Sequence, residues 1–73
     1  MEREHLIKLH RILADRFSKG ELRTLCFTLG VDYDDLPGEG KSDKARELIV
    51  YLEHRGRIPE LVETGEQLRP DRR

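Results

Sequence analysis

Residues 18 to 30, "SKGELRTLCFTLG", carry signals for the start, the buried face and the end of one helix. Ser18 and Glu21 have the spacing of a capping box, in which each side chain accepts a hydrogen bond from a backbone amide at the helix start. Four apolar residues follow at helical spacing: Leu22, Leu25, Cys26 and Leu29. Gly30 comes next, where glycine readily adopts the left-handed conformation that ends many helices. The stretch therefore predicts a helix of about three turns with one buried face.

Longer helices are predicted on both sides of this stretch. Between residues 2 and 17, one apolar stripe contains Leu6, Leu9, Leu13 and Phe17. Ser42 is a good N-cap for a later helix that runs to about Arg55 and closes at Gly56. Its apolar face contains Ala45, Leu48, Ile49 and Leu52. Val50 and Tyr51 widen this face, which predicts a central helix that lies between neighbours.

Two weaker helical segments complete the pattern. Residues 31–36 carry three apolar anchors among acidic residues before Pro37, so one short helix is predicted there. Pro59 suits the first position of a last helix, although Gly65 weakens that helix by about 1 kcal/mol relative to alanine. Its apolar side contains Ile58, Leu61, Val62 and Leu68. Because the sequence shows no strand pattern and the connections are short, we expect a compact antiparallel all-α bundle.

Length and composition bound the class of protein. A chain of 73 residues forms one domain, since it buries only about 60% of its unfolded surface. We assign residues 1–68 to that domain and residues 69–73 to the start of a linker. The net charge of −1 produces no overall field toward nucleic acid or an anionic membrane. With one cysteine and no apolar run long enough for a signal peptide or a membrane span, we expect a reduced, cytoplasmic protein.

A partial nucleotide-binding motif occurs at Gly40-Lys41-Ser42. A phosphate-binding loop requires an earlier glycine so that the backbone can wrap around the phosphates, and Asp35 occupies that position. The preceding stretch is acidic and does not read as a strand. The glycines are sufficiently explained as a sharp connection before a capped helix, so we expect no nucleotide cofactor.

Patterns for metal binding and catalysis are also incomplete. Asp32 and Asp34 match the first two ligands of a calcium loop, but Leu36 takes the third ligand position and Pro37 replaces the required glycine. The three histidines lack the spacing of a metal site. Cys26 falls on the buried stripe, where an inert thiol is common. We therefore expect no metal site and no enzyme activity.

A helix-turn-helix DNA-binding regulator is the alternative, because such proteins are also built from short helices. A recognition helix should be basic. Here no basic residue occurs between Gly30 and Lys41, and carboxylates in that interval would repel phosphate.

Five short pieces carry a resemblance to a known family: "ELRTLCF" (21–27), "LGVDY" (29–33), "LPGEGK" (36–41), "KAREL" (44–48) and "LRP" (68–70). On these pieces, residues 6 to 70 resemble the bacterial effector-associated, death-like domains, relatives of the death effector domains in the death-fold superfamily. The resemblance implies a bundle of five to six helices that acts as an adaptor ahead of a fused effector domain in bacterial immunity or programmed cell death. It departs from death effector domains at Arg55-Gly56-Arg57-Ile58, which lacks the aspartate of their Arg-x-Asp-Leu motif.

Three apolar residues lie off the main stripes and are candidates for contact with a partner: Phe27, Ile7 and Val50. Phe27 occupies a place similar to that of an exposed apolar residue in death effector domains, and a surface phenylalanine is a useful binding anchor. The alternative is that Phe27 packs beneath the first or the last helix.

Charged residues form two neighbouring groups that are also interaction candidates. The acidic group contains Asp32, Asp34, Asp35 and Glu39, and the basic group contains Lys41, Lys44 and Arg46. A solvated surface explains such groups without any partner. If they lie on different sides of the bundle, they permit a head-to-tail contact with a like domain, and hence a homo-oligomer, a filament or a complex with a related protein.

Overall fold

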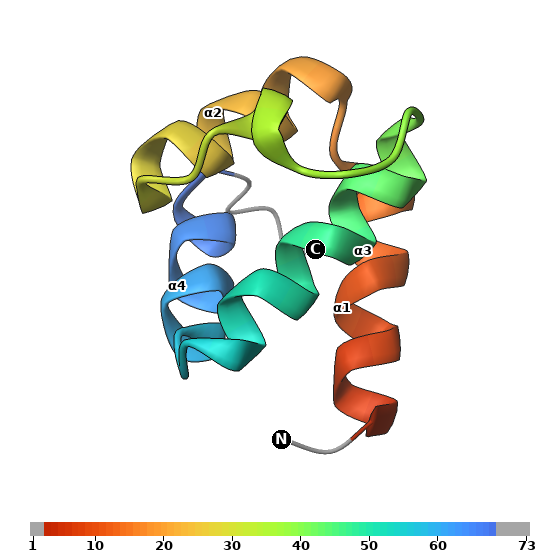
Figure 1. The fold of residues 1–73 in the computed structure, drawn as a ribbon. Coiled ribbons are helices and arrows are strands. Elements are labelled where there is room, and N and C mark those ends of the chain that lie inside the picture. The colour runs from red at the N-terminus through yellow and green to blue at the C-terminus, as the bar shows by residue number, and fades with distance from the viewer. Residues whose placement is uncertain (1–2, 69–73) are drawn as a thin grey trace.

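Four α-helices and one short 3₁₀ turn make up the computed structural model, which describes residues 3–68 (Figure 1). The elements are α1 (Arg3–Arg16), α2 (Lys19–Leu29), η1 (Tyr33–Asp35), α3 (Lys41–His54) and α4 (Ile58–Leu68). No strand occurs in this part of the chain, as the apolar spacing predicted. The short helix expected at residues 31–36 is the 3₁₀ turn η1, and α4 begins one residue before Pro59. The linker assigned to residues 69–73 lies outside the described residues.

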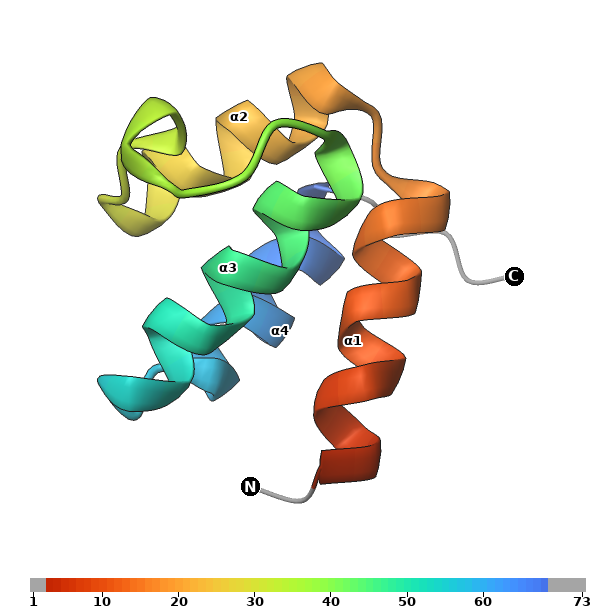
Figure 2. The same ribbon diagram turned by 45° about the vertical axis from the view of Figure 1, so that its right-hand side comes forward.

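The α3 helix occupies the centre of the bundle and contacts each of the other three α-helices. Figures 1 and 2 show α1 along one side of the molecule, α2 crossing the top, and α4 behind α3 in the second view. Every element contributes to the buried core, which contains Leu13, Phe17, Leu22, Leu25, Cys26, Leu29, Val31, Tyr33, Leu36, Ala45, Leu48, Ile49, Leu52, Ile58 and Leu61. The central position predicted for this helix is therefore confirmed.

Both ends of α2 have the predicted caps. The Ser18 hydroxyl oxygen accepts from the Glu21 amide at 3.1 Å, and the Glu21 carboxylate accepts from the Ser18 amide at 2.8 Å. Gly30 follows the helix with φ 79°, a left-handed conformation that costs glycine no steric penalty. These interactions span only a few residues, which explains why the sequence pattern located this helix correctly.

The start of α3 differs from the prediction that Ser42 is its N-cap. The Lys44 amide donates to the Gly40 carbonyl oxygen at 2.9 Å, so the helix begins at Lys41 and Gly40 is the N-cap residue. Gly40 offers no capping side chain, and Ser42 lies inside the first turn. Instead, the Ser42 hydroxyl lies 3.2 Å from His10 Nε2, and its carbonyl oxygen lies 3.0 Å from the same atom. Contact with α1 thus replaces the predicted cap.

Arg57 connects the end of α2 to the start of α4. Its Nη2 donates to the Leu29 carbonyl oxygen at 2.9 Å, and its Nε donates to the Glu60 carboxylate at 2.6 Å. A helix leaves its last carbonyl oxygens without intrahelical partners, and a nearby arginine satisfies one of them here. The segment that departs from the death effector domain motif therefore has a structural role in this chain.

Candidate protein-interaction surface

Phe27 is the most exposed large apolar residue in the described part of the chain, with 84% of its surface accessible. It lies on α2 away from the buried stripe, so α1 and α4 leave it uncovered. A shallow recess beside it is lined by Arg23, Val31, Asp32 and Tyr33. An exposed aromatic ring next to a recess provides apolar area that a partner can bury. The exposure of Phe27, one of the two possibilities left open by the sequence, is thus decided.

Arg23 lines this recess and forms an ion pair with Asp34 of η1. The Arg23 guanidinium carbon lies 5.0 Å from the Tyr33 ring centroid, and Arg23 Nη1 lies 3.4 Å from Asp34 Oδ1. Both charged side chains are largely exposed, so this ion pair contributes little to stability. Burial raises the pKa of the Tyr33 hydroxyl above its ordinary value. The arrangement places the Arg23 cation beside the exposed ring of Phe27, with Asp34 as the ion-pair partner of Arg23.

Lys41 and Lys44, two members of the predicted basic group, have their ammonium groups directed to backbone carbonyl oxygens. Lys41 Nζ donates to the Phe17 oxygen at 2.9 Å. Lys44 Nζ donates to the oxygens of Tyr33 at 3.0 Å and Leu36 at 2.7 Å. These contacts give both lysines an internal structural role. Their binding to a partner stays a prediction.

Arg46, the third member of that group, is exposed and lies near two carboxylates of its own helix. Its Nη1 is 3.7 Å from Asp43 Oδ1, and its Nη2 is 3.4 Å from Glu47 Oε2. Glu39, from the acidic group, is exposed in the loop before α3. The two charged groups do not form an ion pair with each other within residues 3–68: Asp34 pairs with Arg23 of α2 and not with a lysine of α3.

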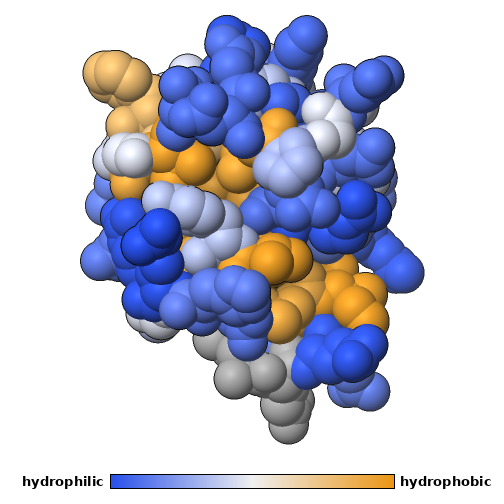
Figure 3. Space-filling view, viewed as in Figure 1, coloured by the Kyte–Doolittle hydropathy of each residue, from blue (hydrophilic) through white to orange (hydrophobic). Residues whose placement is uncertain are grey.

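Ile7 and Val50 are brought together by the packing of α1 on α3. They are 51% and 41% exposed, and both line a recess between the two helices. Arg3 and Arg46 also line it. On the face of the molecule seen in Figure 3, apolar surface occurs in two separate areas with hydrophilic surface between them. The sequence placed each residue off its stripe but did not indicate that the two are neighbours.

A further recess, between α2, η1 and α3, was not predicted. We call it the acidic recess and define it by the carboxylates of Asp32, Asp35 and Glu47 around Leu36, Val50 and Tyr51. It has a volume of about 480 Å³. Asp32 and Asp35 belong to the acidic group that the sequence identified, whereas Glu47 lies beside them because α3 folds back beneath η1. No local pattern could have identified this grouping.

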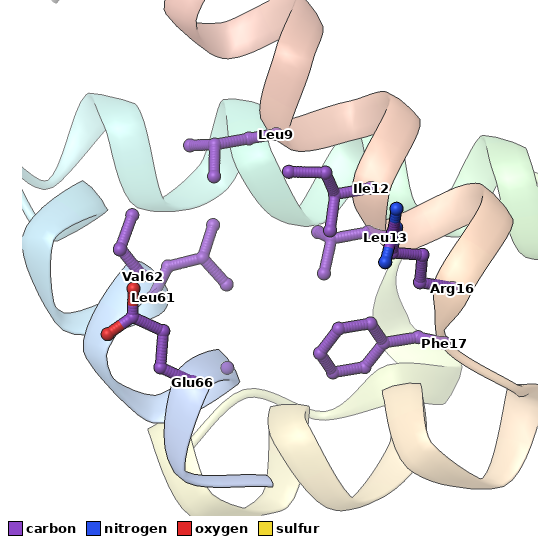
Figure 4. Close-up of a pocket in the computed structure, with 9 residues that line it drawn as sticks. Leu9, Ile12, Leu13, Arg16, Phe17, Leu61, Val62 and Glu66 are labelled. Carbon is purple, nitrogen blue, oxygen red and sulfur yellow. The ribbon is translucent and has the colours of Figure 1, made fainter. Parts of the chain in front are cut away.

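An apolar groove also lies between α1 and α4. Its side chains point toward the space between the two helices from both sides, with the Phe17 ring at one end (Figure 4). Ile12 of α1 lines this groove and is 41% exposed. Arg16 from α1 and Glu66 from α4 border it, and its volume is about 300 Å³. This groove, the acidic recess and the recess between α1 and α3 therefore differ in the charge of their linings.

The described residues offer surfaces for contact rather than a cluster of reactive groups. No set of three histidine, cysteine, aspartate or glutamate side chains among residues 3–68 is arranged to hold a metal ion. Burial raises the pKa of the Cys26 thiol to about 11, so the thiol is protonated at neutral pH. None of the helices described is long and apolar enough to cross a membrane.

Comparison with known proteins identifies the family. Residues 9–70 match the model of Effector-associated domain 7. No curated protein and no solved structure matches the chain. The family match spans the bundle from the middle of α1 to the end of α4, and it includes Phe27 and the acidic recess, whereas Arg3 and Ile7 precede it. The chain therefore belongs to the effector-associated domain 7 family, and this membership indicates a regulatory or adaptor role in proteins that carry a fused effector.

Proposed function

We propose that this chain is a non-enzymatic adaptor domain that binds a like domain, either a second copy of itself or a related domain. The observation that carries the proposal is the 84% exposure of Phe27 beside a recess on α2. A folded domain leaves such a ring uncovered at a cost, and burial against a partner recovers it. Family membership supports the same role, since an effector-associated domain is a part of a larger effector protein.

The size of the contribution from Phe27 follows from its area. A phenylalanine buries on the order of 150 Å² in an interface, which at about 25 cal/mol per Å² is worth several kcal/mol before the costs of association. Interface residues of this kind commonly contribute about 2 kcal/mol or more. We therefore expect Phe27 to be an anchor of the contact, with Arg23 and Asp34 setting orientation at its rim.

Binding of this kind acts on the fused effector through local concentration. When two adaptor domains associate, the effector domains tethered to them are held at an effective concentration set by the linkers. Effectors that activate one another by contact then become active without any catalytic step in the adaptor. We propose this clustering as the role of the chain in bacterial immunity or programmed cell death.

Sedimentation velocity at high protein concentration and low ionic strength tests the proposal. We expect the wild-type chain to associate, and Phe27→Ser to weaken the association constant about 30-fold, which corresponds to about 2 kcal/mol. Ile12→Ser is the matched control, because Ile12 is an exposed apolar residue on a different hollow, the groove between α1 and α4. Circular dichroism should show that both variants are folded, since neither side chain belongs to the buried core.

Two results would contradict the proposal. One is a wild-type chain that stays monomeric under these conditions and also fails to bind a related domain from the same family. The other is a Phe27→Ser variant that associates as strongly as the wild-type chain. Fluorescence anisotropy with a labelled DNA duplex at physiological salt tests the helix-turn-helix alternative, and specific binding there would favour it over the adaptor role.

A further inference from the structure

We propose that the acidic recess of one copy binds the outer face of α1 of a second copy, so that the chain assembles head to tail. The inference rests on the proposed self-association and names the surface that covers the acidic recess. The recess adjoins the Phe27 surface, because Val31 and Asp32 line both hollows. One partner helix laid across this region can therefore contact the recess and the exposed ring together.

The acidic recess has the composition of a receptor for a basic, partly apolar helix. Asp32 and Asp35 are exposed, and no ion pair involves either carboxylate within residues 3–68. The third carboxylate, Glu47, lies 3.4 Å from Arg46 Nη2, an arginine outside the recess lining. No lysine or arginine lines the recess. Leu36 and Val50 supply apolar surface between the carboxylates.

The outer face of α1 has the complementary composition. We call it the basic face and define it by Arg3, Ile7, Lys8 and Arg11. Arg3, Ile7 and Arg11 are spaced four residues apart and so lie in one row along the helix. All four side chains are exposed, and Ile7 is 51% accessible. Within the described chain, no ion pair uses the three cations. Glu4 and Asp15 are exposed carboxylates on this side of α1, and the three cations still leave it with a positive balance.

The other two apolar hollows fit the basic face less well. The recess between α1 and α3 is lined by Arg3 and Arg46 against one carboxylate, Glu53, so its charged side chains carry a positive excess that disfavours a basic partner. The groove between α1 and α4 is bordered by Arg16 and Glu66, whose charges balance. Of the hollows described above, the acidic recess is the one that combines apolar surface with an excess of negative charge. Charge therefore selects it as the site for α1 of a second copy.

The positions of the two surfaces require a contact that repeats. Figures 1 and 2 agree in placing α1 at one side of the bundle and the C-terminal ends of α2 and α3 at the other. A domain therefore cannot cover its own acidic recess with its own α1. Each copy offers one basic face and one acidic recess, so the contact is heterologous and extends into a ring or a filament.

Charge reversal on each surface tests the inference in the intact chain by sedimentation velocity. We expect Lys8→Glu and Asp35→Lys each to weaken association by about tenfold or more, because each places like charges across the contact. The double variant Lys8→Glu with Asp35→Lys should associate again, since its reversed surfaces are complementary. Glu63→Lys on α4 makes the same change in net charge as Asp35→Lys, and this control should leave association unchanged.

The outcomes separate this inference from the proposed function. If the wild-type chain does not associate, the proposed self-association fails as well. If it associates and Phe27→Ser disrupts it, but the two reversals have no effect or the folded double variant stays monomeric, only the head-to-tail pairing is overturned. A loss of DNA binding in Lys8→Glu with unchanged association would instead assign the basic face to nucleic acid and would also overturn the inference.

Discussion

Replacement of Lys44 by methionine should destabilise the domain, because the ammonium group of Lys44 holds η1 against α3. Lys44 Nζ donates to the carbonyl oxygens of Tyr33 and Leu36 at 3.0 and 2.7 Å, and it lies 5.1 Å from the Tyr33 ring centroid. Methionine keeps the apolar length of the side chain but cannot donate. The substitution therefore removes the polar interactions while it preserves most of the packing.

The magnitude follows from the two hydrogen bonds and the cation–ring interaction that methionine cannot make. A hydrogen bond from a charged donor contributes about 1.5 to 3 kcal/mol when buried, and a cation over an aromatic ring about 0.5 to 1 kcal/mol at an exposed site. Both Lys44 hydrogen bonds are partly buried, so we take about 1 kcal/mol for each. The total is about 2.5 kcal/mol, a large fraction of the roughly 5 kcal/mol typical of a small domain.

Urea unfolding followed by circular dichroism measures this change. With a slope of about 1 kcal/mol per molar urea for a small domain, the loss of about 2.5 kcal/mol should lower the midpoint by about 2.5 M. Lys8→Met is the matched control, because Lys8 is exposed and has no ion pair in the described chain, and its midpoint should move by less than about 0.5 M. Dilute protein keeps self-association from contributing to either value.

One result would refute the reasoning about Lys44. If Lys44→Met unfolds at the same urea concentration as the wild-type chain and yet loses self-association, the lysine acts at an interface and its hydrogen bonds with η1 are not needed for stability. The basic interaction group expected from the sequence would then be correct for Lys44.

Three further predictions concern the backbone, a helix cap and the buried thiol. Gly38→Ala should cost at least about 2 kcal/mol, because φ is 98° and a Cβ would lie 2.6 Å from that of Asp43. Gly40→Ala meets no atom within 4 Å and replaces only an N-cap glycine, so it should cost less than about 1 kcal/mol; thermal unfolding compares the two variants. Ser18→Ala should lower the free energy of unfolding by about 1 kcal/mol in urea through loss of the capping box. The Cys26 thiol should react with Ellman's reagent far more slowly in the folded chain than in urea at pH 8. Because burial raises its pKa from 9.0 to about 11, the unfolded chain loses this proton first, and stability should fall as the pH rises through that interval but fall less in Cys26→Ala. Equal native and unfolded reactivity would contradict the burial of the thiol.

Local patterns predicted most of the helical structure. The capping box at Ser18 and the glycine at Gly30 bounded α2, and the apolar spacing placed Cys26 in the core, where it is 1% exposed. Ser42 was assigned wrongly, since the N-cap residue of α3 is Gly40 and the serine contacts His10 of α1. The limits of α2 were predicted correctly because a cap or an apolar stripe depends on residues within about one turn. The N-cap of α3 was predicted wrongly because the choice between Gly40 and Ser42 also depends on α1, which is distant in the sequence.

The candidate site was less predictable, because exposure depends on which helix covers which face. The sequence identified Phe27, Ile7 and Val50 as off-stripe residues but could not say whether another helix covers them. The sequence also showed which residues are charged but not which groups they contact. Lys44 was therefore predicted to belong to a basic surface, whereas its ammonium group donates to the carbonyl oxygens of Tyr33 and Leu36.

By itself, the sequence determined the helical class, the limits of α2 and the identity of most core residues, because these depend on spacing along the chain. Tertiary structure alone decided that Phe27 is uncovered and that Asp35 and Glu47 share one recess. Those features arise where segments far apart in the sequence meet. Their positions are set by packing around α3, which no local pattern contains.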